Sequence, residues 1–138
     1  LILIGGLSLS PDLSGEDEAT PEPPQATPED SQIMARLDTL MADKRPYLDP
    51  DLTLNVLSRK LSVPAKQLSA AINRSTGENV SRYINGARIR TAQEALLQGR
   101  TVTQAMFAAG FNTKSNFNRE FLRVTGQSPS DWQKGQGV

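Results

Sequence analysis

Two segments of the chain carry cationic, amide and hydroxyl side chains at helical spacing, opposite an apolar stripe. The first segment contains Lys66, Gln67, Ser69, Ala70 and Asn73. The second contains Lys114, Ser115, Asn118 and Arg119. Lys and Arg pair with guanine O6 and N7, Asn and Gln pair with adenine, and Ser adapts to either purine. The two faces therefore predict hydrogen bonding to the edges of DNA bases.

Each of these segments follows a short helical stretch and a tight turn. In the first repeat, residues 53–61 precede the turn Ser62-Val63-Pro64; in the second, residues 101–109 precede Gly110-Phe111-Asn112. This order is typical of a helix-turn-helix, which presents its second helix to the major groove. One polar face alone could equally be ordinary solvated surface. The repetition of the whole arrangement favours two DNA-reading helices.

Further polar residues around these segments are candidates for contact with phosphates, which position a protein without reading sequence. The candidates are Arg59, Lys60, Arg74, Arg82, Arg100, Asn116 and Arg123, together with the helix starts at Thr53 and Thr101, whose backbone N–H groups are free to bind anions. Arg88 lies between apolar neighbours, so a structural pairing with a carboxylate is as good an interpretation for it as a DNA contact.

Helical periodicity predicts the elements that position these residues. We expect a first helix over 31–42, capped by Asp30 or Ser31, and then a turn over 45–51. Thr53 caps the next helix, whose inward residues are Leu54, Leu57 and Leu61. The helix after Pro64 buries Leu68, Ala71 and Ile72 and ends at Gly77.

A long helix is expected over 79–98, which joins the two repeats. In the second reading helix the buried residues should be Phe117, Phe121 and Leu122, and a last helix should begin at Ser128-Pro129 with Trp132 docked on the core. No segment has the alternation of a strand. The predicted fold class is therefore all-α, with two helix-turn-helix subdomains joined by a long linker helix and about seven helices in total.

The 138 residues have a formal net charge of zero that is unevenly divided. Residues 1–30 carry seven acidic residues and no basic one, whereas residues 31–138 carry eight acidic and fifteen basic residues. The second part attracts polyanions, although such a surplus also serves solubility alone. Five prolines among acids, Ser and Thr predict a disordered acidic linker or upstream remnant over 1–30 and a folded DNA-binding domain over 31–138.

The chain contains neither Cys nor His. Disulfides are excluded, and the commonest zinc ligands and the usual general base near neutral pH are missing. We therefore expect no enzyme activity, no catalytic residue, no metal and no cofactor. Residues 1–9 are largely apolar but too few to span a bilayer, which takes roughly 20 residues. The end of a membrane helix, part of an upstream domain and vector-derived residues are three open interpretations of them.

Leu52 to Trp132 resembles the C-terminal DNA-binding domain of AraC/XylS-type transcription regulators. The motifs that carry the resemblance are Ala109-Gly110-Phe111, Ser115 to Phe121, Thr125 to Trp132 and, in the long helix, Tyr83 to Ala92. The resemblance implies seven helices and two recognition helices in adjacent major grooves on one DNA face. It assigns base reading to Lys66, Ser69 and Ala70 in the first helix and to Lys114, Ser115, Asn118 and Arg119 in the second.

Two positions depart from the family pattern. Ala70 stands where a long polar residue is frequent, which predicts that the first helix reads fewer bases. Ala105-Met106 replaces the usual Ile-Ala pair, which puts the packing of that helix in question.

The resemblance also implies a bacterial, cytoplasmic regulator that binds double-stranded DNA and RNA polymerase. Activators are one kind of such regulator, but the residues do not separate activation from repression. Members carry an upstream sensory or dimerisation domain, which we expect to precede this chain, and the full-length protein could be anchored in a membrane. The alternative function is a helical protein–protein interaction module without specific DNA binding.

Overall fold

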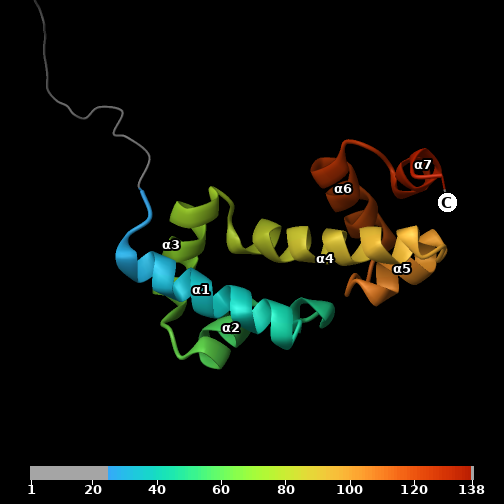
Figure 1. The fold of residues 1–138 in the computed structure, drawn as a ribbon. Helices are drawn as coiled ribbons and strands as arrows, with labels where there is room; N and C mark the ends of the chain where they lie inside the picture. The colour runs from blue at the N-terminus through green and yellow to red at the C-terminus, as the bar shows by residue number, and fades with distance from the viewer. Residues whose placement is uncertain (1–24, 138) are drawn as a thin grey trace, which may run out of the picture.

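The computed structural model describes residues 25–137, so most of the predicted linker, including residues 1–9, lies outside the described residues. The elements are α1 (Pro28–Asp43), the short 3-10 helix η2 (Pro46–Leu48), α2 (Leu54–Leu61), α3 (Ala65–Thr76), α4 (Val80–Leu97), α5 (Val102–Ala108), α6 (Lys114–Thr125) and α7 (Pro129–Gly135). No strand occurs within 25–137. The predicted all-α fold with seven α-helices is confirmed (Figure 1).

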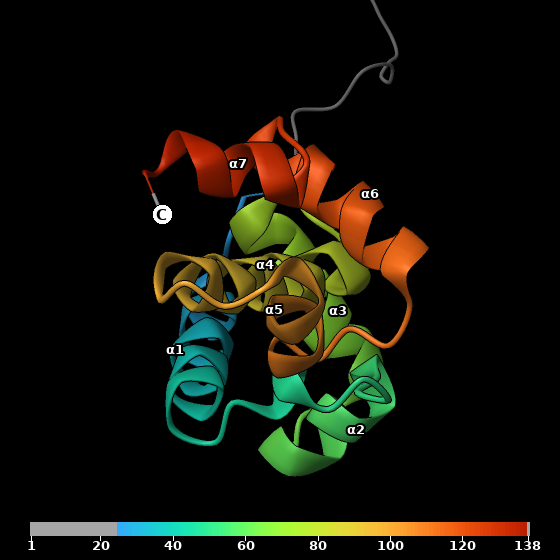
Figure 2. The ribbon, with the colours of Figure 1, turned by 90° about the vertical axis from the view of Figure 1, so that its right-hand side faces the viewer.

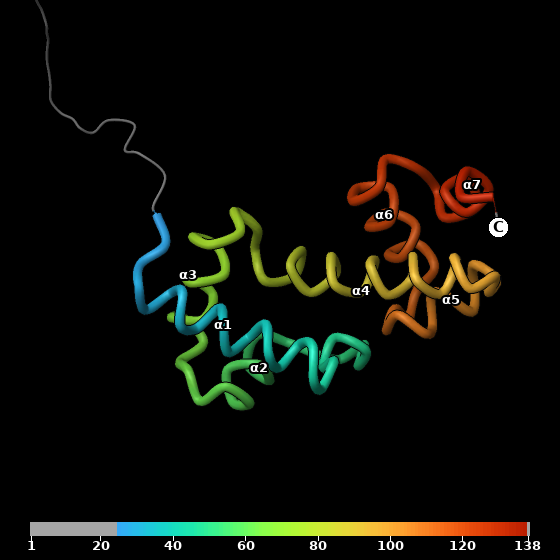
Figure 3. Tube along the Cα trace, viewed as in Figure 1, coloured from blue at the N-terminus to red at the C-terminus, as the bar shows by residue number. Residues whose placement is uncertain are grey.

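The long helix α4 is the scaffold to which both helix-turn-helix units attach. Figure 3 shows α1, α2 and α3 beside its N-terminal part and α5, α6 and α7 beside its C-terminal part. The buried side chains form two clusters, one ending at Ala87 and the other beginning at Ile89. The buried residue between them is Arg88, so a charged side chain lies where the two apolar cores meet.

Aromatic side chains dominate the second core. Phe111 lies 5.1 Å from Phe117 between ring centroids, Phe117 lies 5.7 Å from Phe121, and Phe121 lies 5.8 Å from Trp132. Tilted and edge-on pairs at these separations are favourable beyond the burial of their area. The predicted docking of Trp132 on the core is confirmed. Ala105 and Met106 are buried in the same cluster, so the unusual pair is accommodated in α5.

Side-chain caps determine where most of the helices begin. Thr53, Asn79, Thr101 and Thr113 each accept a hydrogen bond from the amide of the third residue of the helix that follows. These bonds satisfy amide donors that a helix start leaves unpaired. The predicted cap at Thr53 and stop at Gly77, which is left-handed with φ 75°, are confirmed.

The two helix-turn-helix turns have the same backbone design. In the first turn, the amide of Val63 donates to the carbonyl of Ser58 (3.1 Å). In the second turn, the amide of Phe111 donates to the carbonyl of Met106 (3.1 Å). The residue before each donor is left-handed, Ser62 with φ 54° and Gly110 with φ 92°. A Cβ added to Gly110 would lie 2.5 Å from the carbonyl oxygen of Tyr47. The second turn therefore packs closely on η2, and only glycine fits there.

The structure corrects three details of the predicted elements. Helix α1 begins at Pro28 and not near Ser31, because Thr27 and Asp30 form a reciprocal capping box that places Asp30 inside the first turn. Leu122 is 56% exposed rather than buried, and Glu120 takes the inward position instead. The predicted turn at 45–51 includes η2, which buries Tyr47. Among the described residues, no helix is both long and apolar enough to cross a membrane.

Candidate nucleic-acid interface

The two predicted reading helices, α3 and α6, pack on α4 at separate points along its length. Their C-terminal ends both lie above α4 in Figure 1, whereas α2 lies below it. In Figure 2, the view along α4, α6 and α1 lie on opposite sides of that helix. Neither reading helix is enclosed by the rest of the molecule, since each keeps one face open to solvent.

In α3, the predicted inward residues Leu68, Ala71 and Ile72 are fully buried. Lys66, Gln67 and Asn73 are exposed on the outward face, as predicted. Ser69 and Ala70 are half-buried, because they lie between the outward face and the packed stripe. Fewer positions of α3 are therefore fully exposed than the sequence predicted.

In α6, Phe117 and Phe121 are buried, and Lys114, Ser115, Asn118 and Arg119 are all exposed. The guanidinium of Arg119 donates to Oδ1 of Asn116 (2.5 Å) and lies 3.8 Å from the carboxylate of Glu120. These contacts orient a long side chain before any ligand arrives, which reduces the entropy lost on binding. Half-buried Asn116 is thus a support for Arg119.

Four of the phosphate candidates, Arg59, Lys60, Arg82 and Arg100, are exposed, and none of them forms an ion pair with another described residue. Thr53 and Thr101 are exposed caps. Thr101 and Gln104 form a capping box at the start of α5, so part of the first turn there is already satisfied.

Arg74 is engaged within the protein. It donates from Nε (2.6 Å) and from a terminal nitrogen (2.9 Å) to the carboxylate of Asp30, which is 1% exposed. The bond from Arg74, followed by the bond from the Thr27 amide, holds the pKa of Asp30 well below its usual range. This pair joins the start of α1 to the end of α3, and we therefore assign Arg74 a structural role.

Arg123 is likewise paired. Its guanidinium donates to Oε1 of Glu120 (2.9 Å) and lies 3.6 Å from Oε2 of Glu78 in the loop before α4. Burial alone would raise the pKa of Glu120, but hydrogen bonds from Arg123 and Asn85 outweigh burial and lower it. Asn85 donates to the same carboxylate (3.2 Å).

Arg88 completes a network of buried polar groups. It donates to the carbonyls of Tyr47 (2.7 Å) and Asp49 (2.8 Å) and to Oδ1 of Asn85 (3.0 Å). The structural role expected for Arg88 is present, but the expected carboxylate partner is wrong, because backbone carbonyls and an amide take that place. Sequence reasoning missed Glu120 and Asn85. The signal for Glu120 was its position three residues after Phe117, on the buried stripe.

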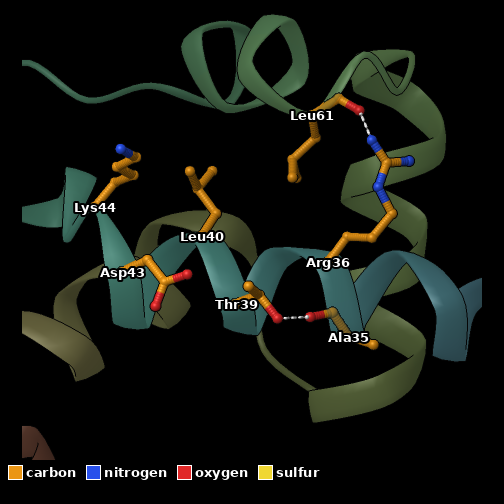
Figure 4. Close-up of a pocket in the computed structure, with 7 residues that line it drawn as sticks. All are labelled: Ala35, Arg36, Thr39, Leu40, Asp43, Lys44 and Leu61. Carbon is orange, nitrogen blue, oxygen red and sulfur yellow. Dashed lines mark hydrogen bonds between the residues drawn. The ribbon is translucent and has the colours of Figure 1, made fainter.

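A surface pocket lies away from both reading helices. It has a volume of about 460 Å³ and lies between α1 and the end of α2, lined by Ala35, Leu40 and Leu61 among others (Figure 4). Arg36 spans one side, where it donates to the carbonyl of Leu61. None of the predicted base-reading residues lines this pocket. Within 25–137, no group of three or more acidic residues is arranged to hold a metal ion.

Comparison with known proteins places these features in a family. A family model described as a helix-turn-helix domain matches residues 57–135. The HTH-type transcriptional activator RhaS of Citrobacter koseri is 26% identical over 103 residues, which are 74% of this chain and 37% of that protein. The chain thus spans well under half the length of this relative.

Two solved structures have the same fold at low identity. The C-terminal domain of AraT, a response regulator from Geobacillus stearothermophilus, superposes with a TM-score of 0.64 at 22% identity, covering 79% of this chain and 86% of that one. An AraC-type transcriptional regulator from Chromobacterium violaceum gives a TM-score of 0.65 at 16% identity, covering 78% and 94%. With the family match over both helix-turn-helix units, the chain belongs to the AraC-type helix-turn-helix family of DNA-binding regulator domains.

Proposed function

We propose that this chain is the DNA-binding module of a sequence-specific bacterial transcription regulator that inserts α3 and α6 into adjacent major grooves. The observation that carries the proposal is the pair of exposed polar helix faces supported by one scaffold helix, α4. Successive major grooves on one side of a duplex are about 34 Å apart, or about 10 base pairs.

In this proposal, α6 reads more bases than α3. Arg119 pairs with a guanine and Asn118 with an adenine, while Lys114 and Ser115 contact the neighbouring bases. In α3, Lys66, Gln67 and Asn73 extend to bases, and Ser69 and Ala70 make close contacts without long side chains. Arg59, Lys60, Arg82 and Arg100 bind phosphates together with the first-turn amides after Thr53 and Thr101.

Selection from a randomised duplex pool at moderate salt tests this function. We expect enrichment of a site of roughly 20 base pairs with two half-sites about one helical turn apart. We also expect the affinity to fall steeply with salt, because each phosphate contact releases counterions. If the selection enriches no motif and the DNA affinity does not change with salt, the helical protein-interaction module is favoured instead.

The wider biology is proposed from the relatives. RhaS is described as a transcriptional activator, and we infer the same activity for the full-length protein, in the cytoplasm, with an upstream sensory or dimerisation domain and RNA polymerase as partners. Transcription with purified bacterial RNA polymerase, from a promoter that carries the selected site, tests activation. An unchanged or lowered transcript level would contradict it. Membrane anchoring is tested by fractionating cells that express the full-length protein.

A further inference from the structure

A chain of polar side chains connects the two helix-turn-helix units. Arg123 in the last turn of α6 lies 2.9 Å from Glu120 and 3.6 Å from Glu78, which is two residues beyond the end of α3. Glu120 also accepts a hydrogen bond from Asn85, and Asn85 in turn accepts one from Arg88; both residues are on α4. We call Glu78, Arg123, Glu120, Asn85 and Arg88 the polar network. It joins the C-terminal ends of both recognition helices.

The relative orientation of α3 and α6 depends on few contacts. Each helix packs on α4, and neither packs extensively on the other. The ion pair between Arg123 and Glu78 is therefore a direct tie between the two reading units. The side chains of Arg123 and Glu78 are 26% and 40% exposed, so their attraction is screened by salt less than that of a fully exposed pair. Glu120, 9% exposed, holds the same guanidinium from within α6.

We propose that Arg123, Glu78 and Glu120 are positioning residues, which fix the tilt of α6 relative to α3 and thereby the half-site spacing that the protein accepts. This inference rests on the proposed function. Two linked reading units gain affinity only where both engage at once, so a fixed angle penalises any site with the wrong spacing. In this role Arg123 touches neither base nor phosphate, which replaces the sequence-based prediction for it.

The first test needs no DNA. Because the chain has no cysteine, the double variant Gln67→Cys and Asn118→Cys carries nitroxide labels at two chosen positions only, one on α3 and one on α6. Pulsed electron resonance then gives the distribution of distances between the two helices. We expect a broader distribution when Glu78→Gln or Arg123→Gln is added. Glu78 is at the surface, so Glu78→Gln keeps the test available if Arg123→Gln does not fold.

Glu94→Gln is the matched control. It also removes a surface ion pair of α4, the 3.7 Å contact with Arg45, but this pair does not touch either recognition helix. We expect this control to leave the distance distribution unchanged. A distribution equally narrow with and without Glu78→Gln and Arg123→Gln would overturn the proposal, whatever the DNA affinity.

The second test uses the unlabelled protein and the selected duplex with one base pair added or removed between the half-sites. Wild type and Glu94→Gln should lose affinity by a factor on the order of 100 on the altered duplexes, and Glu78→Gln by less than about 10. Equal losses in all three proteins would overturn the proposal. If wild type selects no sequence at all, the proposed function fails, and the label distances still decide whether the polar network fixes the helices.

Discussion

At the scale of single residues, the outward faces of α3 and α6 differ in how well their long side chains are supported. Arg119 is held by Asn116 and Glu120, whereas Lys66 and Gln67 form no side-chain hydrogen bond or ion pair with any described residue. A supported guanidinium binds with less loss of side-chain entropy and more exact geometry. Sequence discrimination should therefore depend more on α6 than on α3.

Arg119→Ala tests this difference. We expect a loss of roughly 1–3 kcal/mol in binding free energy on the preferred duplex and a relaxed preference at one base-pair position. Competition binding against duplexes substituted at each position measures both effects. Lys134→Ala removes an exposed cation of α7 and serves as the control; an even loss across all sequences for Arg119→Ala would contradict base reading.

Asp30 gives the fold a dependence on acid. Its pKa in the folded protein is depressed, mainly by the Arg74 bond, so the bond stabilises the fold above the unfolded-state pKa of Asp. That contribution is lost progressively as the pH falls below about 4, toward the depressed value. Urea unfolding of Asp30→Asn across pH 2–7 should give a lower stability than wild type at neutral pH and a smaller fall in acid. If the stabilities of wild type and Asp30→Asn changed in parallel with pH, this prediction would be contradicted.

At the scale of the elements, the two similar turns bear unequal constraints. Ser62 and Gly110 have the same left-handed backbone, but only Gly110 lies directly against another element, the carbonyls of Tyr47 and Leu48 in η2. A side chain at Ser62 is tolerated because that residue is exposed. The second turn thus contributes to the attachment between the two halves as well as reversing the chain.

Gly110→Ala should therefore be far more damaging than Gly77→Ala. Both glycines are left-handed, and each replacement costs about 1 kcal/mol for that conformation alone. A Cβ at Gly77 meets nothing, but at Gly110 it meets backbone oxygen, which must move. Equilibrium urea unfolding measures the two losses of stability, and equal losses would show that η2 yields easily.

The sequence predicted the helices well because caps and apolar spacing are local signals. Thr53, Gly77 and the stripe of Leu68, Ala71 and Ile72 were all identified, since each depends on residues within a few positions. The start of α1 and the inward Glu120 were missed. Each had a local signal, the Thr27–Asp30 capping box for α1 and the spacing from Phe117 for Glu120. The partners that hold these two carboxylates, Arg74 for Asp30 and Asn85 for Glu120, lie far along the chain and no local pattern reveals them.

At the scale of the whole molecule, charge determines how the protein approaches DNA. From Leu52 onward the chain has twelve basic and four acidic residues, and the exposed Arg59, Lys60, Arg82 and Arg100 form no ion pair with a described residue. Such cations attract any duplex irrespective of its sequence. In the proposed function, base reading by α3 and α6 then discriminates among the bound positions.

Arg82→Ala tests the part of DNA binding that does not depend on sequence. It should weaken preferred and unrelated duplexes by a similar factor and reduce the slope of log affinity against log salt by about 1, because one phosphate contact is lost. Titrations at several salt concentrations measure the slope. An unchanged slope would place Arg82 away from the phosphates.

The burial of Arg88 between the two apolar clusters has a consequence for unfolding. If either half melted alone, the carbonyls of Tyr47 and Asp49 would lose their donor, and Gly110 would leave η2. Each half is therefore penalised for opening without the other, and the domain should melt in a single cooperative transition despite its two cores. In calorimetry, the van't Hoff and calorimetric enthalpies should agree, and peptides severed near Gly99 should fold together rather than apart.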